Sequence, residues 1–125
     1  MGILLDTQIF LWLTSGDPRL NARGRDLIDN SDRVFVSSAT IWEVSIKVGL
    51  KKLAADPELL LQEMEANGFE ELPVLAKHAR GVAKLAHHHG DPFDRLLIAQ
   101  AIAESLRLLT ADGQLAAYSE LVVAI

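Results

Sequence analysis

The 125-residue sequence contains no cysteine, which excludes disulfide bonds and thiolate metal sites and favours a reducing compartment, so we expect a cytoplasmic protein. No apolar run is long enough to span a membrane. The apolar start, from Ile3 to Leu13, is interrupted by Asp6 and has no basic leader, so we expect no signal peptide. A Gly-rich loop ending in Lys-Ser or Lys-Thr is also missing, which excludes a P-loop nucleotide binder.

The sequence also has few basic residues. It contains 12 Lys and Arg residues and 17 Asp and Glu residues, which gives a net charge of −5. An acidic chain does not bind nucleic acid through its overall charge. A nucleic-acid function would therefore need local basic patches, a bound metal ion, or both. The basic residues are densest within residues 19–25 and 47–52, and each group taken alone is best explained as a solvated helix face.

Apolar residues are plentiful at 50%, enough for a real core, and the chain has the length of one ordinary domain. Two kinds of segment alternate along it, which predicts a single α/β domain over residues 1–125, with a three-layer α/β/α architecture and a mainly parallel central sheet of four or five strands. We expect strands at Ile3–Leu5, Val34–Val36, Phe69–Leu72, Leu106–Leu109 and Leu121–Ala124. Helices are expected at Thr7–Thr14, Ala22–Asp29, Ala39–Val48, Pro57–Ala66, Ala76–His87, Pro92–Ser105 and, as a short one, Gln114–Tyr118.

The segment from His89 to Ala101 is the most informative part of the sequence. Asp91 is a natural helix N-cap, and Pro92 suits the first helical position, where its missing N–H costs nothing. Asp94 then falls in the first turn, near the positive end of the helix. The helix that follows is apolar almost all round, so we expect it to be central and buried and its first turn to be a rigid support.

Four acidic residues fall where a parallel sheet would bring them together. Asp6 ends the first predicted strand, and Asp112 follows a later one. Glu43 lies in the helix after the second strand, and Asp94 opens the buried helix. Because carboxyl ends of parallel strands share one edge, we predict that these four side chains meet there. Clustered carboxylates need compensation, which Mg²⁺ or Mn²⁺ supplies, and such an ion can drive phosphodiester hydrolysis.

Each acid also has a purely structural explanation. Asp6 and Asp91 can cap helices, and Asp94 can complement a helix dipole. Glu43 and Lys47 have the spacing of a surface ion pair, and Asp112 with Gly113 can form a turn. The joint pattern favours a shared site, because four independent caps would not need to share one sheet edge.

Histidines and aromatic residues are weaker candidates. Residues 87–89 are three adjacent histidines, which cannot all face one ion from a regular element. A dinuclear His/Asp site usually needs spaced ligands, so we expect a solvated loop, with His89 at most at the site entrance. The aromatic residues Trp12, Trp42 and Phe93 are expected in the core or in an interface rather than as platforms for RNA bases.

The chain resembles the PIN domain family, in particular the VapC-type toxins of prokaryotic toxin–antitoxin pairs. The resemblance covers essentially the whole chain. It rests on residues 4–7 (Leu-Leu-Asp-Thr), on residues 38–43 with their Trp-Glu pair, on the block 89–101, and on residues 109–112 (Leu-Thr-Ala-Asp). The block 89–101 is highly specific, whereas the other segments are individually weak but occur in the right order.

The resemblance implies a Mg²⁺- or Mn²⁺-dependent endoribonuclease. Asp6, Glu43, Asp94 and Asp112 match the family's acidic quartet, with Asp6 and Asp94 as the closest metal ligands and the other two acting directly or through water. Contacts from a second shell are expected of Thr7, Ser38, Thr110, Asp91 and Arg95, of which Arg95 is expected to contact phosphate or a neighbouring acid. The resemblance also implies a homodimer neutralised by a small antitoxin whose tail enters the acidic pocket, where an arginine would suit the carboxylates.

Other classes fit less well. A phosphoacceptor receiver domain would need a lysine after its last active-site strand, and no lysine follows Lys84. A haloacid-dehalogenase-like phosphatase would need an aspartate two residues after Asp6, where the chain has Gln8. The remaining alternative is a non-catalytic PIN-like binding module whose acidic pocket is inert.

Overall fold

The computed structural model describes residues 2–88 and 90–125. His89, expected at the site entrance, lies outside the described residues. The sheet has five strands in the order β3-β2-β1-β4-β5, and every pairing between neighbours is parallel. The strands are β1 (Ile3–Leu5), β2 (Val34–Ser37), β3 (Glu70–Leu72), β4 (Arg107–Thr110) and β5 (Val122–Ala124). The predicted parallel α/β fold is therefore confirmed.

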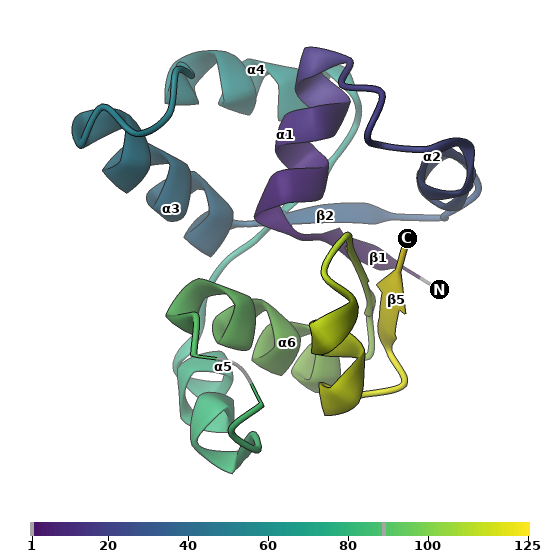
Figure 1. The fold of residues 1–125 in the computed structure, drawn as a ribbon, viewed down its shortest axis with the longest axis vertical. Helices are drawn as coiled ribbons and strands as arrows, with labels where there is room; N and C mark the ends of the chain where they lie inside the picture. Colours follow the sequence, from purple (N-terminus) through teal and green to yellow (C-terminus); the bar gives the residue numbers. More distant parts are fainter. Residues whose placement is uncertain (1, 89) are drawn as a thin grey trace.

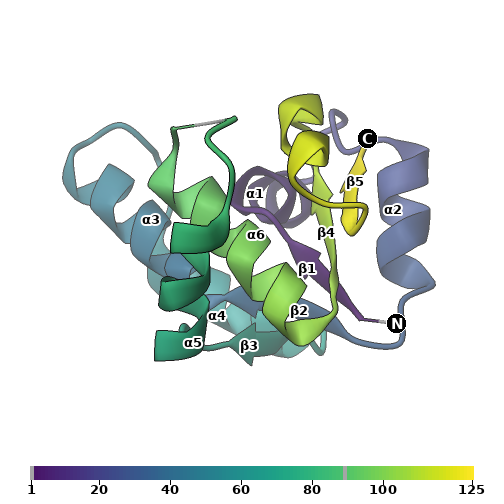
Figure 2. The same cartoon turned by 90° about the horizontal axis from the view of Figure 1, so that it is seen from below.

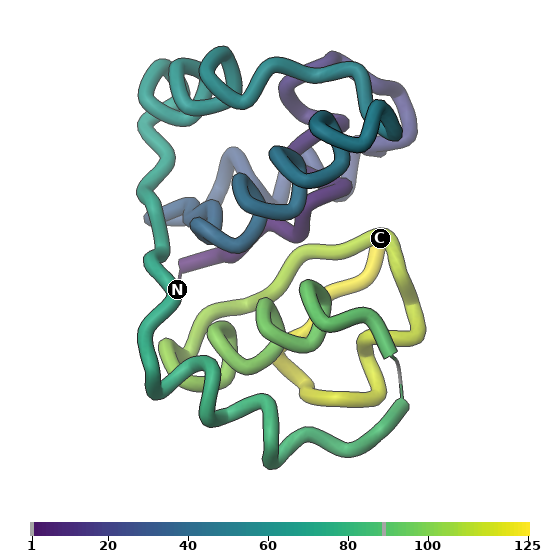
Figure 3. Tube along the Cα trace, turned by 90° about the vertical axis from the view of Figure 1, so that its left-hand side faces the viewer, coloured from purple at the N-terminus to yellow at the C-terminus, as the bar shows by residue number. Residues whose placement is uncertain are grey.

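Helices cover the sheet on both sides (Figure 1). One layer contains α1 (Thr7–Ser15), α2 (Ala22–Asp29), α3 (Ser38–Gly49) and α4 (Pro57–Ala66). In the other layer, α6 (Pro92–Glu104) and the 3₁₀ helix η2 (Gly113–Tyr118) pack on the sheet, as seen in Figure 2, and α5 (Ala76–Gly81) with the short 3₁₀ helix η1 (Val82–Lys84) packs against α6. The chain passes from one layer to the other after α4, along the β3 edge of the sheet (Figure 3).

Strand β1 explains why the sheet is covered on both faces. Ile3 and Leu5 point into the core beneath α1–α4, whereas Leu4 points into the core beneath α6 and η2. All three side chains are fully buried. A run of apolar residues without polar alternation is typical of a parallel strand covered on both sides.

Polar residues at the carboxyl edge of the sheet begin the helices that follow. Asp6 caps α1 directly after β1, and Ser37 at the end of β2 accepts a hydrogen bond from the backbone N–H of Ala39 at 3.0 Å to cap α3. Asp91 caps α6, with Pro92 as its first residue, as predicted. These local signals place the starts of α1, α3 and α6, and two of the caps are themselves candidate site residues.

The segment 76–87 is not one helix, which corrects the expectation of a helix from Ala76 to His87. The α-helix ends at Gly81, and one 3₁₀ turn follows. The carbonyl of Val82 accepts hydrogen bonds from the N–H of Leu85 at 3.2 Å and from the guanidinium of Arg95 at 3.3 Å. The same guanidinium donates a hydrogen bond to the carbonyl of Ala86 at 2.8 Å. A side chain from α6 therefore occupies carbonyl groups that would accept backbone N–H groups in a continuing helix.

Helix α6 is less enclosed than its sequence predicted. Leu97, Ile98 and Ala101 are buried, but Ile102 is 43% exposed. Helix α5 packs against α6, yet its six residues cover only about 9 Å at 1.5 Å each, whereas α6 with 13 residues extends for about 20 Å. Part of this apolar helix therefore faces an open hollow. Among the described residues, no helix is long and apolar enough to cross a lipid bilayer.

Truncating the centre of β1 tests this packing. Leu4→Ala should lower the free energy of unfolding by about 2–5 kcal/mol, because it removes a fully buried side chain between the sheet and α6. Chemical denaturation followed by circular dichroism measures the change. Leu59→Ala is the matched control, since Leu59 is 56% exposed and its loss should cost no more than about 0.5 kcal/mol. Equal costs for the two variants would contradict the assigned core.

Candidate active site

Five carboxylates line one cavity of about 730 Å³ at the carboxyl ends of β1 and β4. We call it the acidic cavity; its acidic residues are Asp6, Glu43, Asp91, Asp94 and Asp112. The sheet order β3-β2-β1-β4-β5 means that the chain winds outward in one direction from β1 and in the other from β4. The cavity thus lies where the strand order reverses, the usual place for a ligand in an open parallel sheet. The structure brings all four acids of the predicted quartet to this cavity.

Asp6 is the most enclosed of these acids, with 6% of its surface exposed. Its Oδ1 accepts the N–H of Ile9 at 2.8 Å, and its Oδ2 accepts the hydroxyl of Thr110 at 2.5 Å. Burial raises the pKa of Asp6 from 3.8 to about 6; the two hydrogen bonds oppose this rise, and the charges of Asp94 and Glu43 add to it. The end of β1 therefore holds a carboxylate that is costly to ionise without a compensating cation.

Glu43 is also buried and is held from two sides. Its Oε1 accepts the hydroxyl of Thr7 at 2.8 Å, and its Oε2 accepts the ammonium of Lys47 at 2.7 Å, one turn along α3. The Thr7 hydroxyl also lies 3.1 Å from that of Thr40, which must be the donor to Thr7. The pKa of Lys47 is raised, chiefly by its hydrogen bond to Glu43, and the charges of Asp91 and Asp94 contribute. The Lys47 ammonium therefore serves as a counter-ion for the acidic cavity.

Asp91 and Asp112 each use one carboxylate oxygen as a cap. Oδ1 of Asp91 accepts the N–H groups of Phe93 at 2.8 Å and Asp94 at 3.1 Å, and Oδ1 of Asp112 accepts that of Gln114 at 2.9 Å. Within the described part of the chain, the second oxygen of each takes no hydrogen bond. Asp94 lies in the first turn of α6, as predicted. The capping explanations of Asp6 and Asp91 are therefore correct, whereas Glu43 pairs with Lys47 as a buried rather than a surface acid and Asp112 caps η2. All four residues still line one cavity.

The acidic cavity fits a hard divalent cation in donor type and in charge. Its lining has five carboxylates against two ammonium groups, those of Lys47 and Lys52. Carboxylate oxygens are the ligands that Mg²⁺ and Mn²⁺ prefer, and both ions keep several water molecules. Across residues 2–88 and 90–125, no three His, Asp or Glu side chains already converge on a single point as a closed ligand set. The carboxylates thus surround a space rather than forming a rigid cage.

Two hydroxyls make the contact expected of them, and two other side chains do not. Thr7 donates to Glu43, and Thr110 donates to Asp6. Ser38 instead accepts the N–H of Val74 at 3.1 Å, because the first residue of α3 faces the loop after β3. Arg95 was expected at a phosphate or an acid, but it is 8% exposed and donates to the carbonyls of Val82 and Ala86 and, at 3.1 Å, to the hydroxyl of Tyr118.

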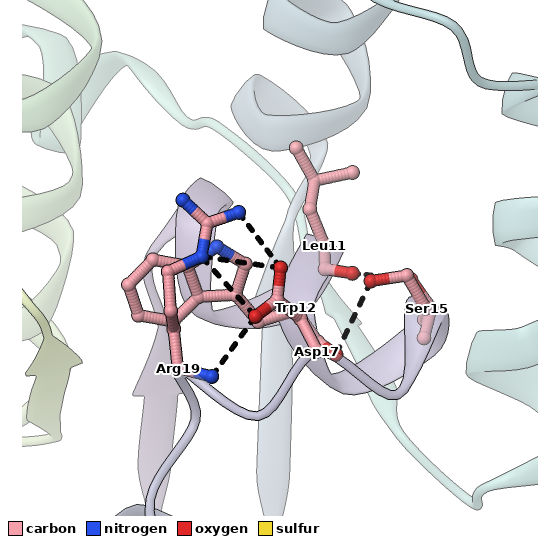
Figure 4. A network of polar contacts seen from close by, with 6 residues as sticks. Leu11, Trp12, Ser15, Asp17 and Arg19 are labelled. Atoms are coloured by element: carbon pink, nitrogen blue, oxygen red, sulfur yellow. Dashed lines mark hydrogen bonds and ion pairs between the residues drawn. The ribbon is translucent and has the colours of Figure 1, made fainter.

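The aromatic residues divide between a cavity wall and the outer surface. Trp12 lines the acidic cavity and a neighbouring cavity of about 440 Å³. Figure 4 shows the guanidinium of Arg19 over its ring, 5.0 Å from the centroid, held there by Asp17. Trp42 is 59% exposed and packs edge-on against Phe93 at 5.3 Å, so it is not a core residue. Sequence reasoning missed Trp12 as a wall of the site and Thr40 as a donor to Thr7, since neither has a local signal.

The buried carboxylate of Asp6 predicts an unusual pH dependence in metal-free buffer. Between pH 3.8 and about 6, the folded chain holds a proton that the unfolded chain has released. The stability contributed by protonated Asp6 is complete below about pH 4 and is lost as the pH rises through about 6. Asp6→Asn keeps the shape of the side chain but cannot ionise. Its free energy of unfolding, relative to that of wild type, should therefore rise by on the order of 3 kcal/mol between about pH 4 and pH 7.

Chemical denaturation in EDTA at several pH values measures this gain. Asp26→Asn is the matched control, because it is the same substitution at an exposed residue on α2 outside the acidic cavity. Parallel stability curves for wild type and Asp6→Asn would show that burial does not raise the pKa of this carboxyl.

Known proteins resemble this chain in sequence and in structure. Ribonuclease VapC22 of Mycobacterium tuberculosis (strain ATCC 25618 / H37Rv) is 27% identical over 115 residues, which are 90% of this chain and 88% of the relative. The crystal structure of VapBC2 from Rickettsia felis bound to a promoter DNA fragment has a TM-score of 0.70 at 19% identity, covering 98% of this chain and 96% of the other. A toxin–antitoxin complex from Klebsiella pneumoniae has a TM-score of 0.68 at 22% identity, with the same coverage.

The family model that matches is the PIN domain, and it extends over residues 3–121. That range includes both caps, the acidic cavity and strands β1 to β4, and it ends one residue before β5. The resemblance that the sequence motifs indicated is thereby confirmed, and the chain belongs to the PIN domain family.

Proposed function

We propose that this PIN domain is a Mg²⁺- or Mn²⁺-dependent endoribonuclease and the toxin of a type II toxin–antitoxin pair. The observation that carries the proposal is the acidic cavity, in which five carboxylates meet at the carboxyl edge of the sheet. A relative named as a ribonuclease and structural neighbours that are toxin–antitoxin complexes support it. The cytoplasmic location expected from the lack of cysteine stays a prediction.

Asp6 and Asp94 would hold the divalent cation, with Glu43 and Asp112 completing the site directly or through water. A cation bound there supplies neutralisation of the phosphodiester charge and activation of water for in-line attack. Thr110 fixes the orientation of Asp6, and Thr7 fixes that of Glu43. Because α1 and α6 begin at the cavity on capped and partly buried first turns, the carboxylates need little rearrangement to accept a cation and a substrate phosphate.

The capped turn of α6 gives Asp94 a defined position beside Asp6. In the proposed hydrolysis, the oxygen of the attacking water bonds to phosphorus while the bond from phosphorus to the leaving oxygen breaks, and the leaving oxygen takes a proton from solvent. The water's proton passes to a carboxylate at the edge of the cavity. Asp112 suits this role, since its Oδ2 has no partner among the described residues and its Oδ1 is fixed by Gln114.

The activity test compares carboxylates inside and outside the acidic cavity. Purified protein should cut RNA in Mg²⁺ or Mn²⁺ and stop in EDTA. Asp6→Asn and Asp94→Asn should each lower the cleavage rate by at least about 100-fold, since losing even a residue that only hydrogen-bonds to a metal ligand typically costs 10- to 100-fold. Gel analysis of a panel of labelled RNAs measures the rate. Asp26→Asn, on α2, should keep the wild-type rate.

Equal cutting by wild type and Asp6→Asn would identify a contaminating nuclease and would contradict the proposal. Calorimetric titration with Mn²⁺ then decides between enzyme and binding module. A nuclease site binds the ion in a way that depends on Asp94. The alternative, a PIN-like binding module with an inert pocket, is favoured by folded wild-type protein that neither binds Mn²⁺ nor cuts RNA.

The proposed partner is a small antitoxin whose segment enters the acidic cavity. An arginine side chain suits this place, because its fixed charge and planar fork match carboxylates. The cavity shares Gln8, Leu11, Trp12 and Leu53 with the neighbouring one, which extends the groove towards α4. A homodimer stays a prediction.

A further inference from the structure

We infer that a second cavity, lined by α5, η1, η2 and the second half of α6, binds an unpaired nucleotide of the RNA substrate. The inference rests on the proposed ribonuclease function and identifies the RNA-binding surface that an acidic chain must contain. We call this cavity, of about 430 Å³, the basic pocket; its lining includes Lys77, Arg80, Lys84, His88, Ile102 and Tyr118. Among the described residues, none lines both this pocket and the acidic cavity.

The charge of the basic pocket is opposite to that of the whole protein. Its lining contains Lys77, Arg80 and Lys84 and, among the described residues, no Asp or Glu. Lys77 pairs with Glu104 at 2.8 Å, just outside the lining. Arg80 and Lys84 form neither an ion pair nor a hydrogen bond through their side chains with any described residue. In a chain of net charge −5, two unpaired cations beside one hollow favour an anionic ligand.

The spacing of these cations points the same way. Residues 77, 80 and 84 follow one another at intervals of three and four, which places like charges on one side of α5 and η1. Lys77 and Arg80 lie within α5, and a like-charge pair of this spacing destabilises an α-helix by a few tenths of a kcal/mol. The arrangement gains from an anion that neutralises them, whereas a solvated helix face would gain from alternating charges.

Small and apolar side chains line one part of the basic pocket, which we call its floor. Ala99, Ala103 and Ala117 are small residues, and beside them Ile102 is 43% exposed. This is the face of α6 that the short α5 leaves open. A bare phosphate or sulfate ion would gain nothing from such a floor. A ligand with a flat apolar body and a negative group at its edge fits both the floor and the rim, and a nucleotide has both parts.

Tyr118 gives the hollow a fixed aromatic wall. Its hydroxyl accepts hydrogen bonds from the Arg95 guanidinium and from the N–H of His88, both at 3.1 Å. The ring of His88 packs edge-on against it at 5.1 Å. Aromatic side chains whose orientation is fixed are the usual surfaces on which single-stranded bases stack. Arg95 was expected to contact a phosphate or an acid. It is instead buried beside Tyr118 and acts as the positioning residue for this wall.

The two cavities are built on the same two elements. Asp94 and Ile102 are both on α6, eight residues apart, which corresponds to about 12 Å along the helix. Asp112 caps η2, and Tyr118 ends it six residues later, again about 12 Å at the 3₁₀ rise. At about 3.4 Å per stacked nucleotide, this separation equals roughly three to four nucleotides. One RNA strand can therefore place a phosphate at the acidic cavity and a base about three to four nucleotides away in the basic pocket.

Binding of a fluorescein-labelled single-stranded RNA of twelve nucleotides, measured by anisotropy in EDTA, tests the pocket without cleavage. The double variant Arg80→Gln, Lys84→Gln should weaken binding by at least about ten-fold and lower the slope of log K against log salt by about 0.7 for each lost phosphate contact. The matched control is Arg23→Gln, Lys51→Gln, which changes the net charge equally but lies outside the lining of both cavities. Its dissociation constant for the RNA should lie within two-fold of the wild-type value.

A second variant distinguishes contacts to the base from contacts to the phosphate. Ala103→Phe fills the floor without changing any charge, so it should weaken binding several-fold while leaving the salt dependence as in wild type. Equal weakening by the pocket and control double variants would assign RNA binding to overall charge and overturn the proposal. Unchanged binding by both Ala103→Phe and the pocket double variant would overturn it too.

Competition and light scattering exclude other occupants. A mononucleotide that displaces the RNA as well as an unlabelled oligonucleotide does would make this a site for free nucleotides, which contradicts the proposal. A change in oligomeric state in the pocket variants would assign the surface to a protein contact instead. The binding assay needs no cleavage, so RNA binding that depends on the pocket would still support this inference if the nuclease test failed. Conversely, metal-dependent cutting together with RNA binding that does not depend on the pocket would overturn only this inference.

Discussion

A carboxylate buried at the end of the central strand is the constraint around which this structure is arranged. Asp6 follows three fully buried residues, so its position is set by the core rather than by the surface. Two hydrogen bonds, from Ile9 and Thr110, fix both of its oxygens. Their donors join the start of α1 to the end of β4, so one side chain links the two strands between which the sheet order reverses. The other acids are arranged around this point.

The parts of the site that the sequence predicted well are those with a local cause. Asp91, Pro92 and Asp94 form a helix start whose signals lie within four residues, and the structure has it as expected. Asp6 and Asp112 follow strands of one parallel sheet, so their shared edge follows from the fold class alone. Capping and cavity lining are not rival roles here, since one carboxylate oxygen can cap a helix while the other faces a ligand.

The parts that the sequence did not predict depend on contacts between distant segments. Nothing near Arg95 shows that its guanidinium takes carbonyls of residues 82 and 86, or that this shortens the preceding helix. Ser38 faces a loop 36 residues away. Basic residues are densest within residues 19–25 and 47–52, so density along the chain does not indicate residues 77, 80 and 84. Helical spacing, rather than density, is the signal that would have found them.

The ammonium of Lys47 on Glu43 has a consequence for how the acidic cavity handles ions. A lysine tethered one turn along α3 already occupies one of the two oxygens of Glu43. If a divalent ion binds here as proposed, its loading onto Glu43 is an exchange, in which the Lys47 ammonium gives up its contact and turns towards solvent. The affinity would then be a difference between two cations, and weaker than five carboxylates alone would suggest.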